Sequence, residues 1–593
     1  MQFPIKRLFV LIERWTLPLL VTISLILFCL TIREKMAAGL AANPLEAGVQ
    51  ALTLDSAETG FTLYMNFAIN ITLAWAALKV FMASVGLRLD NYLVKTFSRS
   101  HIVIIAGFSW HNKGEPEQIN QLDFARDLAT SASTSHNVVI AMPTVADDQR
   151  TSLWELGIKV VTYQGNPTAV LNASGISRAD YLFAVCDNPL DNLTLSRAAL
   201  SSASKNKTLK VRCMLEPLHY KRALKLEEYF EEDSLSRLRV FNQSELIARK
   251  ILTQYPPDIA VTNSEDRIHI LLLGMTSITE AILLQFARIG HYKNNLIPKV
   301  TVVGLDVEDR LNKLHADFPS LSEWLEINHI NIDVFEIGQQ ILSNIFNTEN
   351  APATCYITGP VEMENLRVAK MLVGVLASTQ DKTKLANCNV IAIDPPGGTI
   401  ISDYYFNAHH DNRVQVFSLF GTDNSSAKSV VAGSLLGDLD DRIPKQIHDA
   451  YRQNDLDKAK VDPNHKLHPN SVDWDALPEN IRNANRTVAD HLDIKLRAIN
   501  MKLSVGTNSE NIQLSEDQIE VLAIMEHRRW WADRSLSGWR FAEIRNDRKL
   551  HHPNMIPYEE LSEADKQKDR DSVLKIIDIA TQGGKKLVTI RQT

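Results

Sequence analysis

The chain has 593 residues, of which 45% are hydrophobic and 22% charged, a composition typical of globular domains with apolar cores. This length predicts several domains, and the net charge of -7, without a basic arm or stripe, excludes nucleic acid as the main partner. The five cysteines show no metal-ligand spacing, so we expect reduced thiols and a cytosolic location for most of the mass.

Two apolar segments lie near the N-terminus, one from Trp15 to Ile32 and one from Phe61 to Val85. Each is long enough to cross a bilayer. A cleaved signal peptide is the alternative for the first, but its length and the second segment favour two membrane spans. Basic residues flank the pair, whereas the connecting loop 33–60 is acidic, which predicts an inner-membrane protein with both termini in the cytoplasm.

The second apolar segment carries a polar stripe. Thr62, Asn66 and Asn70 recur every four residues and therefore share one helix face. Such a stripe lines a pore, or it supplies hydrogen bonds between helices in a bundle. The stripe alone does not decide between these two roles.

The loop between the spans favours a pore. Pro44 is a good first residue for a short re-entrant helix, and a polar tip follows at residues 55–58. Two spans around such a loop resemble pore-loop channels, in which four chains surround one axis. The potassium filter TVGYG is absent, and acidic rings would favour cations. The alternative is an ordinary extracytoplasmic loop. The predicted pore-lining residues are Thr53, Asp55, Ser56, Glu58, Thr62, Asn66 and Asn70.

From residue 101 onward, short apolar strands alternate with helical segments, which predicts a parallel α/β sheet. Strands are expected at 101–106, 137–142, 159–163 and 180–185. Over roughly residues 99–240 this order resembles the RCK (TrkA-N-type) domain that regulates potassium channels and transporters. Gly107 begins an incomplete glycine motif, and Met142 stands where a ribose-binding acid is expected. We therefore predict a structural Rossmann-like scaffold here.

A second Rossmann-like pattern starts at Arg267, and its first strand ends at Gly274. Tandem units of this kind below a pore resemble the regulatory rings of ligand-gated channels. Ser277 and Thr279 have an alternative role as helix N-caps. If the chain binds a nucleotide as cofactor, we expect the phosphate and the ribose to contact Gly274, Thr276, Ser277, Thr279 and Asp306.

No complete catalytic signature is present, so we expect a binding protein and not an enzyme. A membrane-tethered NAD-dependent oxidoreductase that uses the second Rossmann-like domain is an alternative. The neighbouring histidines at 409–410 and 551–552 diverge on a helix or a strand, so we expect no metal site.

Three of the nine tryptophans, Trp530, Trp531 and Trp539, lie within ten residues of one another. With His552-Pro553 and a following Tyr558, this stretch resembles the RyR domain, named after ryanodine-receptor channels and also found in bacterial proteins. The resemblance implies a regulatory or binding module. Aromatic faces stack on a base or an organic cation, and arginine pairs with phosphate. The alternative for Trp531 and Trp539 is a place in the core. The predicted recognition cluster is His527, Trp531, Arg534, Trp539 and Tyr558.

A degenerate copy of this module precedes it. The spacing from Trp474 to Arg486 repeats the spacing from Tyr558 to Arg570, with a leucine and a basic residue at matching positions. We interpret residues 440–593 as two RyR-type halves packed together. The alternative is that a capped amphipathic helix recurs by chance.

These patterns predict a membrane protein with two transmembrane helices, tandem Rossmann-like domains and a mainly helical RyR module. The expected function is a ligand-regulated, homo-oligomeric, cation-channel-like protein, with a tetramer as the first guess, a lipid bilayer around it and a small nucleotide-like or organic ligand. A membrane-anchored sensor or scaffold without a pore is the alternative. The expected domains are 1–98, 99–260, 261–435, 436–510 and 511–593.

Overall fold

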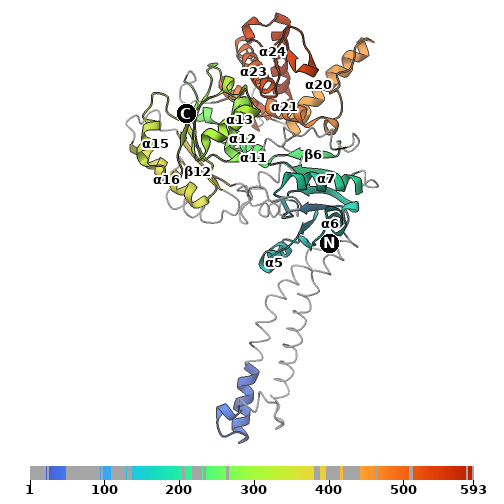
Figure 1. Cartoon of the computed structure of the whole chain (residues 1–593), viewed down its shortest axis with the longest axis vertical. Coiled ribbons are helices and arrows are strands. Elements are labelled where there is room, and N and C mark those ends of the chain that lie inside the picture. Colours follow the sequence, from blue (N-terminus) through green and yellow to red (C-terminus); the bar gives the residue numbers. More distant parts are fainter. Residues whose placement is uncertain are drawn as a thin grey trace. The chain divides into compact units, whose positions relative to one another are not determined.

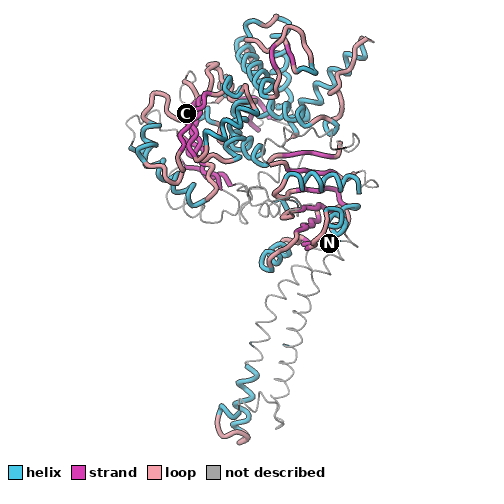
Figure 2. Tube along the Cα trace, in the orientation of Figure 1, coloured by secondary structure: helices cyan, strands magenta, loops and turns pink. Residues whose placement is uncertain are grey.

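The computed structural model describes residues 26–47, 98–108, 136–202, 208–216, 236–261, 266–378, 388–394, 414–418, 441–462, 464–505, 512–581 and 585–590, with isolated residues between 22 and 230. The chain divides into two compact units, one of residues 1–105 and 135–180 and the other of residues 106–134 and 181–593. Figure 1 labels the elements, and Figure 2 distinguishes helices from strands and loops.

In the first unit, three parallel strands pair in the order β3-β2-β1. Their β-branched, apolar sequences suit strands that are buried on both faces. The elements are β1 His101–Ile105, β2 Asn137–Met142, α5 Asp147–Glu155, β3 Lys159–Thr162, α6 Pro167–Ala173 and η1 Ile176–Arg178. His101 is buried, and burial lowers its pKa, while its Nε2 lies 3.0 Å from the carbonyl oxygen of Ser174.

Part of the predicted loop between the spans is described in this unit. Residues 44–47 are helical, as expected for a helical turn that begins at Pro44, and the side chain of Asn43 accepts a hydrogen bond from the N–H of Glu46 at 2.9 Å. No described helix is both long and apolar enough to cross a membrane. Most of both predicted spans and all seven predicted pore-lining residues lie outside the described residues.

The second unit begins with strands that pair in the order β4-β5-β6, all parallel. Asn192 is buried and joins two of them, because its Nδ2 donates to the carbonyl oxygens of Cys186 and Met214 at 2.8 and 3.1 Å. The elements are β4 Ala179–Ala184, α7 Pro189–Ser202, β5 Lys210–Met214, β6 Leu238–Phe241, α11 Gln243–Gln254 and η2 Pro257–Ala260.

A six-stranded parallel sheet follows in the order β12-β11-β10-β7-β8-β9. The chain starts at a central strand, winds outward on one side and then on the other, which is the doubly wound order of Rossmann-like folds. The predicted parallel α/β architecture is therefore confirmed. The elements are β7 His269–Leu273, α12 Ser277–Ile289, β8 Lys299–Gly304, α13 Val307–Asp317, α14 Leu321–Trp324, β9 Glu326–Asn331, α15 Gln339–Phe346, β10 Thr354–Ile357, α16 Glu362–Ser378, β11 Asn389–Asp394 and β12 Val414–Ser418.

The C-terminal module is mainly helical, as predicted, and its two halves share one core. Ile447 and Leu492 from the first half pack in the same cluster as Ile576 and Leu587 from the second. The elements are α20 Arg442–Val461, η3 Trp474–Ala476, α21 Glu479–Asp490, α22 Leu492–Ala498, β13 Met501–Val505, α23 Glu516–Leu536, β14 Arg540–Phe541, η4 Asp547–Lys549, β15 His551–His552, η5 Tyr558–Glu560, α24 Glu563–Thr581 and β16 Lys585–Thr589. β13 and β16 pair antiparallel and so join the halves.

Candidate ligand site in the C-terminal module

The candidate site is built on α23. A capping box starts this helix, in which Ser515 and Gln518 exchange hydrogen bonds with each other's backbone. Four side chains of the last turns are spaced so that they lie on neighbouring positions of one helix side. These are His527, Trp530, Trp531 and Arg534. The helix ends at Ser537, where Gly538 takes a positive φ of 87° and turns the chain toward Trp539.

His527 is buried in the module, and both nitrogens of its ring make polar contacts. Its Nε2 donates to the carbonyl oxygen of Ile556 at 2.8 Å, and its Nδ1 lies 3.2 Å from a carboxylate oxygen of Asp569. A proton must sit between Nδ1 and that carboxylate for the second contact to be favourable. Burial raises the pKa of Asp569, which helps to keep the proton there. Tyr558, also buried, packs with a ring distance of 5.9 Å.

Trp530, Trp539 and His552 form a partly exposed aromatic cluster. The ring of His552 lies 4.9 Å from that of Trp530 and 6.2 Å from that of Trp539. The guanidinium of Arg534 stands 4.9 Å from the centre of the Trp539 ring. Burial, with Arg545 and Arg534 nearby, lowers the pKa of His552 to about 4, so the ring is neutral at pH 7. The cluster therefore offers neutral aromatic faces beside cations, which suits a planar anionic ligand.

Trp531 points to a different place. Its ring lies 5.5 Å from that of Trp324 in α14, at an angle of 78°. The indole N–H of Trp324 donates to Oγ of Ser535 at 2.7 Å, and the ring of His291 lies 5.3 Å from that of Trp324. Trp531 is therefore part of the contact between the module and the second Rossmann-like domain, next to the aromatic cluster.

The five residues predicted as a recognition cluster thus have three different positions. Arg534 and Trp539 lie in the aromatic cluster, His527 and Tyr558 lie in the interior, and Trp531 lies in the contact between domains. Sequence reasoning missed Trp530, His552 and Trp324. Trp530 directly precedes the predicted Trp531, and its spacing of three from His527 was the available signal. Nothing in the sequence indicated Trp324, which is distant along the chain.

A buried ionic cluster connects α22 and α23. Glu526 accepts two hydrogen bonds from Arg529, at 2.9 and 3.0 Å, and one from Nζ of Lys495 at 2.5 Å. All three side chains are at most 5% exposed. Burial opposes ionisation of Glu526, but Arg529 and Lys495 outweigh it and hold its pKa well below the usual range. This cluster joins α22 to α23.

Further polar contacts dock the module on α11, η2 and α12. Asp490 accepts two hydrogen bonds from Arg249, at 2.7 and 2.9 Å, and one from Gln285 at 3.0 Å. Arg497 makes a similar two-pronged pair with Asp258, at 2.6 and 3.0 Å. The planar guanidinium matches both carboxylate oxygens, which fixes orientation as well as distance. The module is therefore held rigidly on these helices.

Two buried histidines in this contact make its stability depend on pH. His491 donates from Nε2 to the carbonyl oxygen of His291 at 2.9 Å, and His291 donates to the carbonyl oxygen of Ala287 at 3.1 Å. Burial, with Arg528 and Arg529 nearby, lowers the pKa of His291 from 6.5 to about 3. The folded protein therefore stays unprotonated here while the unfolded chain takes up a proton.

We expect the free energy of unfolding to be highest above pH 6.5 and to fall as the pH drops toward 3. At about pH 5, His291 alone contributes a loss of about 2 kcal/mol relative to neutral pH. Urea unfolding at both pH values checks this, and His291→Gln should remove about 2 kcal/mol of the difference. An unchanged difference in His291→Gln would contradict the assignment to His291.

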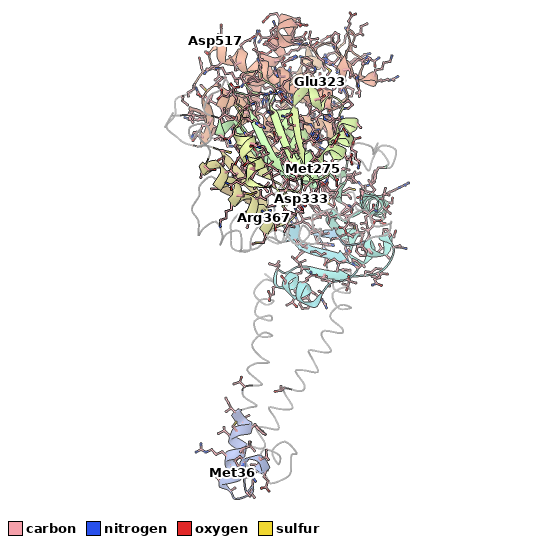
Figure 3. The ribbon with its side chains drawn as sticks, turned by 60° about the vertical axis from the view of Figure 1, so that its left-hand side comes forward. Met36, Met275, Glu323, Asp333, Arg367 and Asp517 are labelled. Carbon is pink, nitrogen blue, oxygen red and sulfur yellow. The ribbon has the colours of Figure 1, made fainter. Side chains whose placement is uncertain are left out.

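The predicted nucleotide loop lies between β7 and α12, where Met275 is labelled in Figure 3. Thr276 and Thr279 form a capping box on α12, and Oγ1 of Thr279 also donates to the carbonyl oxygen of Gly274 at 2.6 Å. These two hydroxyls are used within the loop itself. Ser277 follows the cap at the first position of α12, and Asp306 is exposed with a φ of 53° before α13. Arg310 donates to the carbonyl oxygen of Met275 at 2.9 Å and ties the loop to α13.

Gly274 is required by packing. Its φ is 110°, and a Cβ there would lie 2.9 Å from Oγ1 of Thr358 and 3.0 Å from the backbone nitrogen of Gly359. Gly274→Ala is therefore expected to lower the free energy of unfolding by about 2–4 kcal/mol. Gly374→Ala is the matched control, because nothing lies within 4 Å of its Cβ position in α16. That change should stabilise by about 0.5–1 kcal/mol, and equal effects of the two would contradict the loop geometry.

Comparisons with known proteins bear on the C-terminal module. One solved structure that resembles the chain is GsuK bound to ADP, with 16% sequence identity and a TM-score of 0.35; the match covers 73% of this chain and 98% of that chain. Another is the GsuK channel bound to NAD, with 14% sequence identity and a TM-score of 0.36; the match covers 73% of this chain and 84% of that chain. The GsuK RCK domain gives 13% identity, 58% and 77% coverage and a TM-score of 0.35. Scores this low leave the fold and the function of this chain to its own residues. Residues 506–587, in contrast, match the family model of the RyR domain, which confirms the resemblance carried by the tryptophan cluster: the chain contains a RyR domain.

Proposed function

We propose that the chain is a ligand-regulated, oligomeric, cation-channel-like membrane protein whose RyR domain is the sensor. The observation that carries the proposal is a continuous row of ring contacts from the sensor to the second Rossmann-like domain. A ligand that favours one arrangement of this row shifts the population of the domain it touches. The row consists of His527, Trp531, Trp324 and His291.

The ligand we propose is small, aromatic and anionic, as a nucleotide is. Trp539 and Trp530 present ring faces for stacking, and Arg534 is placed beside them to pair with a phosphate. His552 lies between the two tryptophans and stays neutral, so it does not add charge repulsion or attraction of its own. The proposal is a binding function, without a catalytic step.

The membrane part of the proposal is supported by the sequence of the first ninety residues. Two apolar segments, an acidic loop and the stripe of Thr62, Asn66 and Asn70 suit a pore in an inner membrane. A pore of this kind requires several chains, and we propose a homo-oligomer, with four chains as the first arrangement to test. The Rossmann-like domains would then transmit the state of the sensor to the second span.

Ligand binding tests the sensor. We would titrate ATP, ADP, AMP and NAD into the full-length protein in detergent by calorimetry. Trp539→Ala and Arg534→Ala should each weaken binding by about tenfold, because each removes a central contact. Trp154→Ala is the matched control, since Arg150 stands 5.6 Å over that ring in α5, far from the module in the sequence.

Three results would count against the sensor assignment. Absence of binding by all four nucleotides would remove the nucleotide class. Equal weakening by Trp154→Ala would show that the effect is not local. Binding that survives both module substitutions would place the nucleotide elsewhere, and the predicted loop with Gly274, Thr276, Ser277, Thr279 and Asp306 is then the next candidate.

A further inference from the structure

The two halves of the C-terminal module repeat the same contacts. In the first half, His448 takes the place that His527 has in the second. Its Nε2 donates to the carbonyl oxygen of Val472 at 2.8 Å, and its ring lies 6.0 Å from that of Trp474. His527 makes the same two contacts at 2.8 and 5.9 Å, with partners at the same spacing from one another.

The loop before the single-turn helix repeats as well. The Nδ1 of His468 accepts a hydrogen bond from the backbone N–H of Asn470 at 3.1 Å. The Nδ1 of His552 accepts one from the N–H of Asn554, also at 3.1 Å, and a proline separates the two residues in both halves.

In each half one arginine pairs with two carboxylates. One carboxylate precedes the anchoring histidine by the same number of residues in both halves, and the other precedes the arginine by the same number of residues in both halves. Chance recurrence of a capped helix does not explain this agreement, because the contacts come from three separate elements in each half. Residues 441–490 are therefore a second RyR-type copy. The groups are Arg486 with Asp441 and Glu479, and Arg570 with Glu520 and Glu563.

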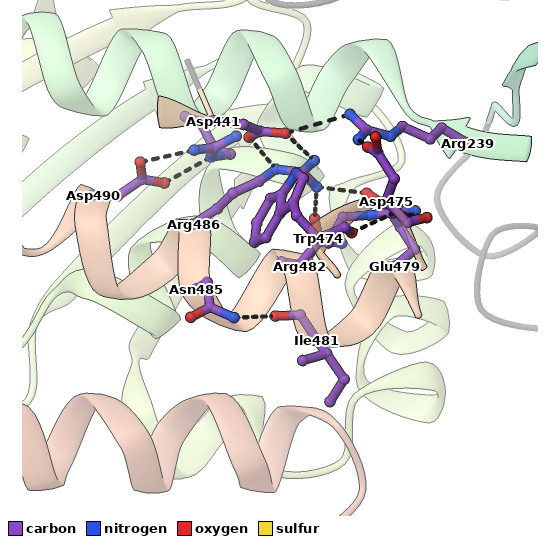
Figure 4. Close-up of polar contacts among 12 residues, drawn as sticks. Arg239, Asp441, Trp474, Asp475, Glu479, Ile481, Arg482, Asn485, Arg486 and Asp490 are labelled. Atoms are coloured by element: carbon purple, nitrogen blue, oxygen red, sulfur yellow. Dashed lines mark hydrogen bonds and ion pairs between the residues drawn. The ribbon is translucent and has the colours of Figure 1, made fainter. Parts of the chain in front are cut away.

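The first copy uses these carboxylates to dock on the rest of the protein (Figure 4). Arg239 of β6 pairs closely with Asp475 and lies 3.8 Å from Asp441. On this face of the first copy, three acidic residues stand beside two arginines of the copy itself, and Arg239 supplies the third positive charge. The acidic residues are Asp441, Asp475 and Glu479, and the two arginines are Arg482 and Arg486. The side chains of Arg239 and Asp441 are 14% and 13% exposed, whereas that of Asp475 is 63% exposed, so solvent is excluded on the Asp441 side of the contact.

The second copy presents the same face to solvent. Glu559 takes the place of Asp475, and its carbonyl oxygen accepts a hydrogen bond from Nζ of Lys566 at 3.2 Å, as that of Asp475 does from Arg482 at 3.3 Å. Glu559 has no ion pair in the described part of the chain, and the side chain of Glu563 is 74% exposed. We call Glu520, Glu559 and Glu563 the acidic face. In the described part of the chain, no cation from outside the module pairs with it as Arg239 of β6 pairs with the first copy; within the module, the charge of Arg528 acts on Glu559.

The exposed loop between β14 and β15 has the complementary character. In the described part of the chain, no ion pair involves Arg540, Arg548 or Lys549, all of which are exposed. Phe541 and Ile544 of the same loop are 54% and 80% exposed, although both are large and apolar. Cations that flank exposed apolar side chains are typical of a surface that meets another protein.

We infer that the acidic face binds a cation from the β14–β15 loop of a second copy of the chain, in the way that the first RyR-type copy binds Arg239. This inference rests on the proposed homo-oligomer and specifies one of its contacts. The two surfaces differ from each other, so the contact is heterologous, and a ring of the proposed homo-oligomer requires that its rotation closes around an axis.

Cysteine cross-linking tests the contact in the full-length protein. In a Cys29→Ser background, which removes the exposed native thiol, we would combine Glu559→Cys with Arg548→Cys and oxidise with copper phenanthroline and oxygen. A cross-linked dimer is expected. In the matched control, Asp475→Cys replaces Glu559→Cys; Asp475 is 63% exposed, and the dimer should still be lost because Arg239 already supplies a cation to that face. A charge swap gives a second readout: Glu559→Lys should lose the native oligomer, and adding Arg548→Glu should restore it.

The mass of the wild-type particle in detergent separates the two proposals. A monomer would overturn the proposed oligomer itself. An oligomer in which the Glu559→Cys pair forms no dimer, or forms no more than the Asp475→Cys control, would overturn this contact and leave the oligomer standing. The dimer together with a restored charge swap would support both.

Discussion

Glu526→Ala is expected to lower the free energy of unfolding of the second unit by about 3–5 kcal/mol, the effect of removing one partner from a buried ion pair. The glutamate is the only counterion within hydrogen-bonding distance of Lys495 and Arg529 among the described residues, and both cations are at most 3% exposed. Without it, two positive charges remain buried side by side between α22 and α23. Urea unfolding of the full-length protein, followed by tryptophan fluorescence, measures the change.

The control for this prediction is an ion pair of similar spacing in solvent. Asp457 pairs with Lys460 at 2.8 Å on α20, and the side chains are 55% and 70% exposed. Asp457→Ala should change the free energy of unfolding by less than about 0.5 kcal/mol, because water and salt screen such a pair. If Glu526→Ala were as mild as Asp457→Ala, the buried cluster would not hold α22 to α23 in the way the structure shows.

Trp324→Ala is expected to lower the free energy of unfolding by about 3–5 kcal/mol and to abolish the response of the Rossmann-like domain to the sensor. The indole is 7% exposed, donates to Ser535 and fills the space between Trp531 and His291. Its loss leaves a cavity in the contact between α14 and α23. Trp324→Phe keeps a six-membered aromatic ring but loses the pyrrole ring with its hydrogen bond to Ser535, so we expect a smaller loss of about 1–2 kcal/mol.

The second part of this prediction has its own measurement. Limited proteolysis of the second Rossmann-like domain, with and without a bound ligand, reports whether the sensor changes it. We expect a ligand-dependent difference in the wild type and in Trp324→Phe, but not in Trp324→Ala. Trp154→Ala, at a residue 41% exposed in α5, should leave the difference intact. A response that persists in Trp324→Ala would show that the row of rings does not carry the coupling.

Most of the fold could be predicted from the sequence, because strands buried on both faces give continuous apolar segments. His269–Leu273 and Asn389–Asp394 are of this kind, and each starts or continues a βα unit. The winding order of the second sheet could not be predicted, since it depends on contacts between distant strands. The docking of the module on α11 and α12 was equally hidden, because Arg249 and Asp490 are far apart in the sequence.

The candidate site could be predicted only in part. The density of tryptophans marked the region that matches the RyR family model, because large aromatic side chains gather in few places in a chain of this composition. The roles of single residues were not separable, since His527 in the interior and Trp539 near the surface carry the same kind of sequence signal. The internal duplication separates them afterwards. His527 has a counterpart, His448, with the same contacts and is a scaffold residue, whereas Arg534 is replaced by Asp455 in the first copy.

Asp455 shows how the first copy differs from the second at the position of Arg534. Its carboxylate accepts hydrogen bonds from His465 at 2.7 Å, from the backbone N–H of His468 at 2.9 Å and from Ser471. These hydrogen bonds hold the pKa of Asp455 well below the usual range, and the one from Ser471 has the largest effect. In the first copy, an acidic side chain therefore occupies the sequence position of Arg534. Its hydrogen bonds go to His465, His468 and Ser471 in the loop that follows α20. The first copy pairs with Arg239 of β6, and the second copy is the one in which we propose that a ligand binds.

The most direct test of the account is cation flux from liposomes that contain the purified full-length protein, measured with and without the nucleotide that binds most tightly. We expect a flux that the nucleotide changes, that Trp539→Ala makes insensitive to the nucleotide, and that the joint change of Thr62, Asn66 and Asn70 to leucine abolishes. A protein that binds the nucleotide but conducts nothing, or whose flux survives the triple change, would contradict the pore and leave a membrane-anchored sensor in its place.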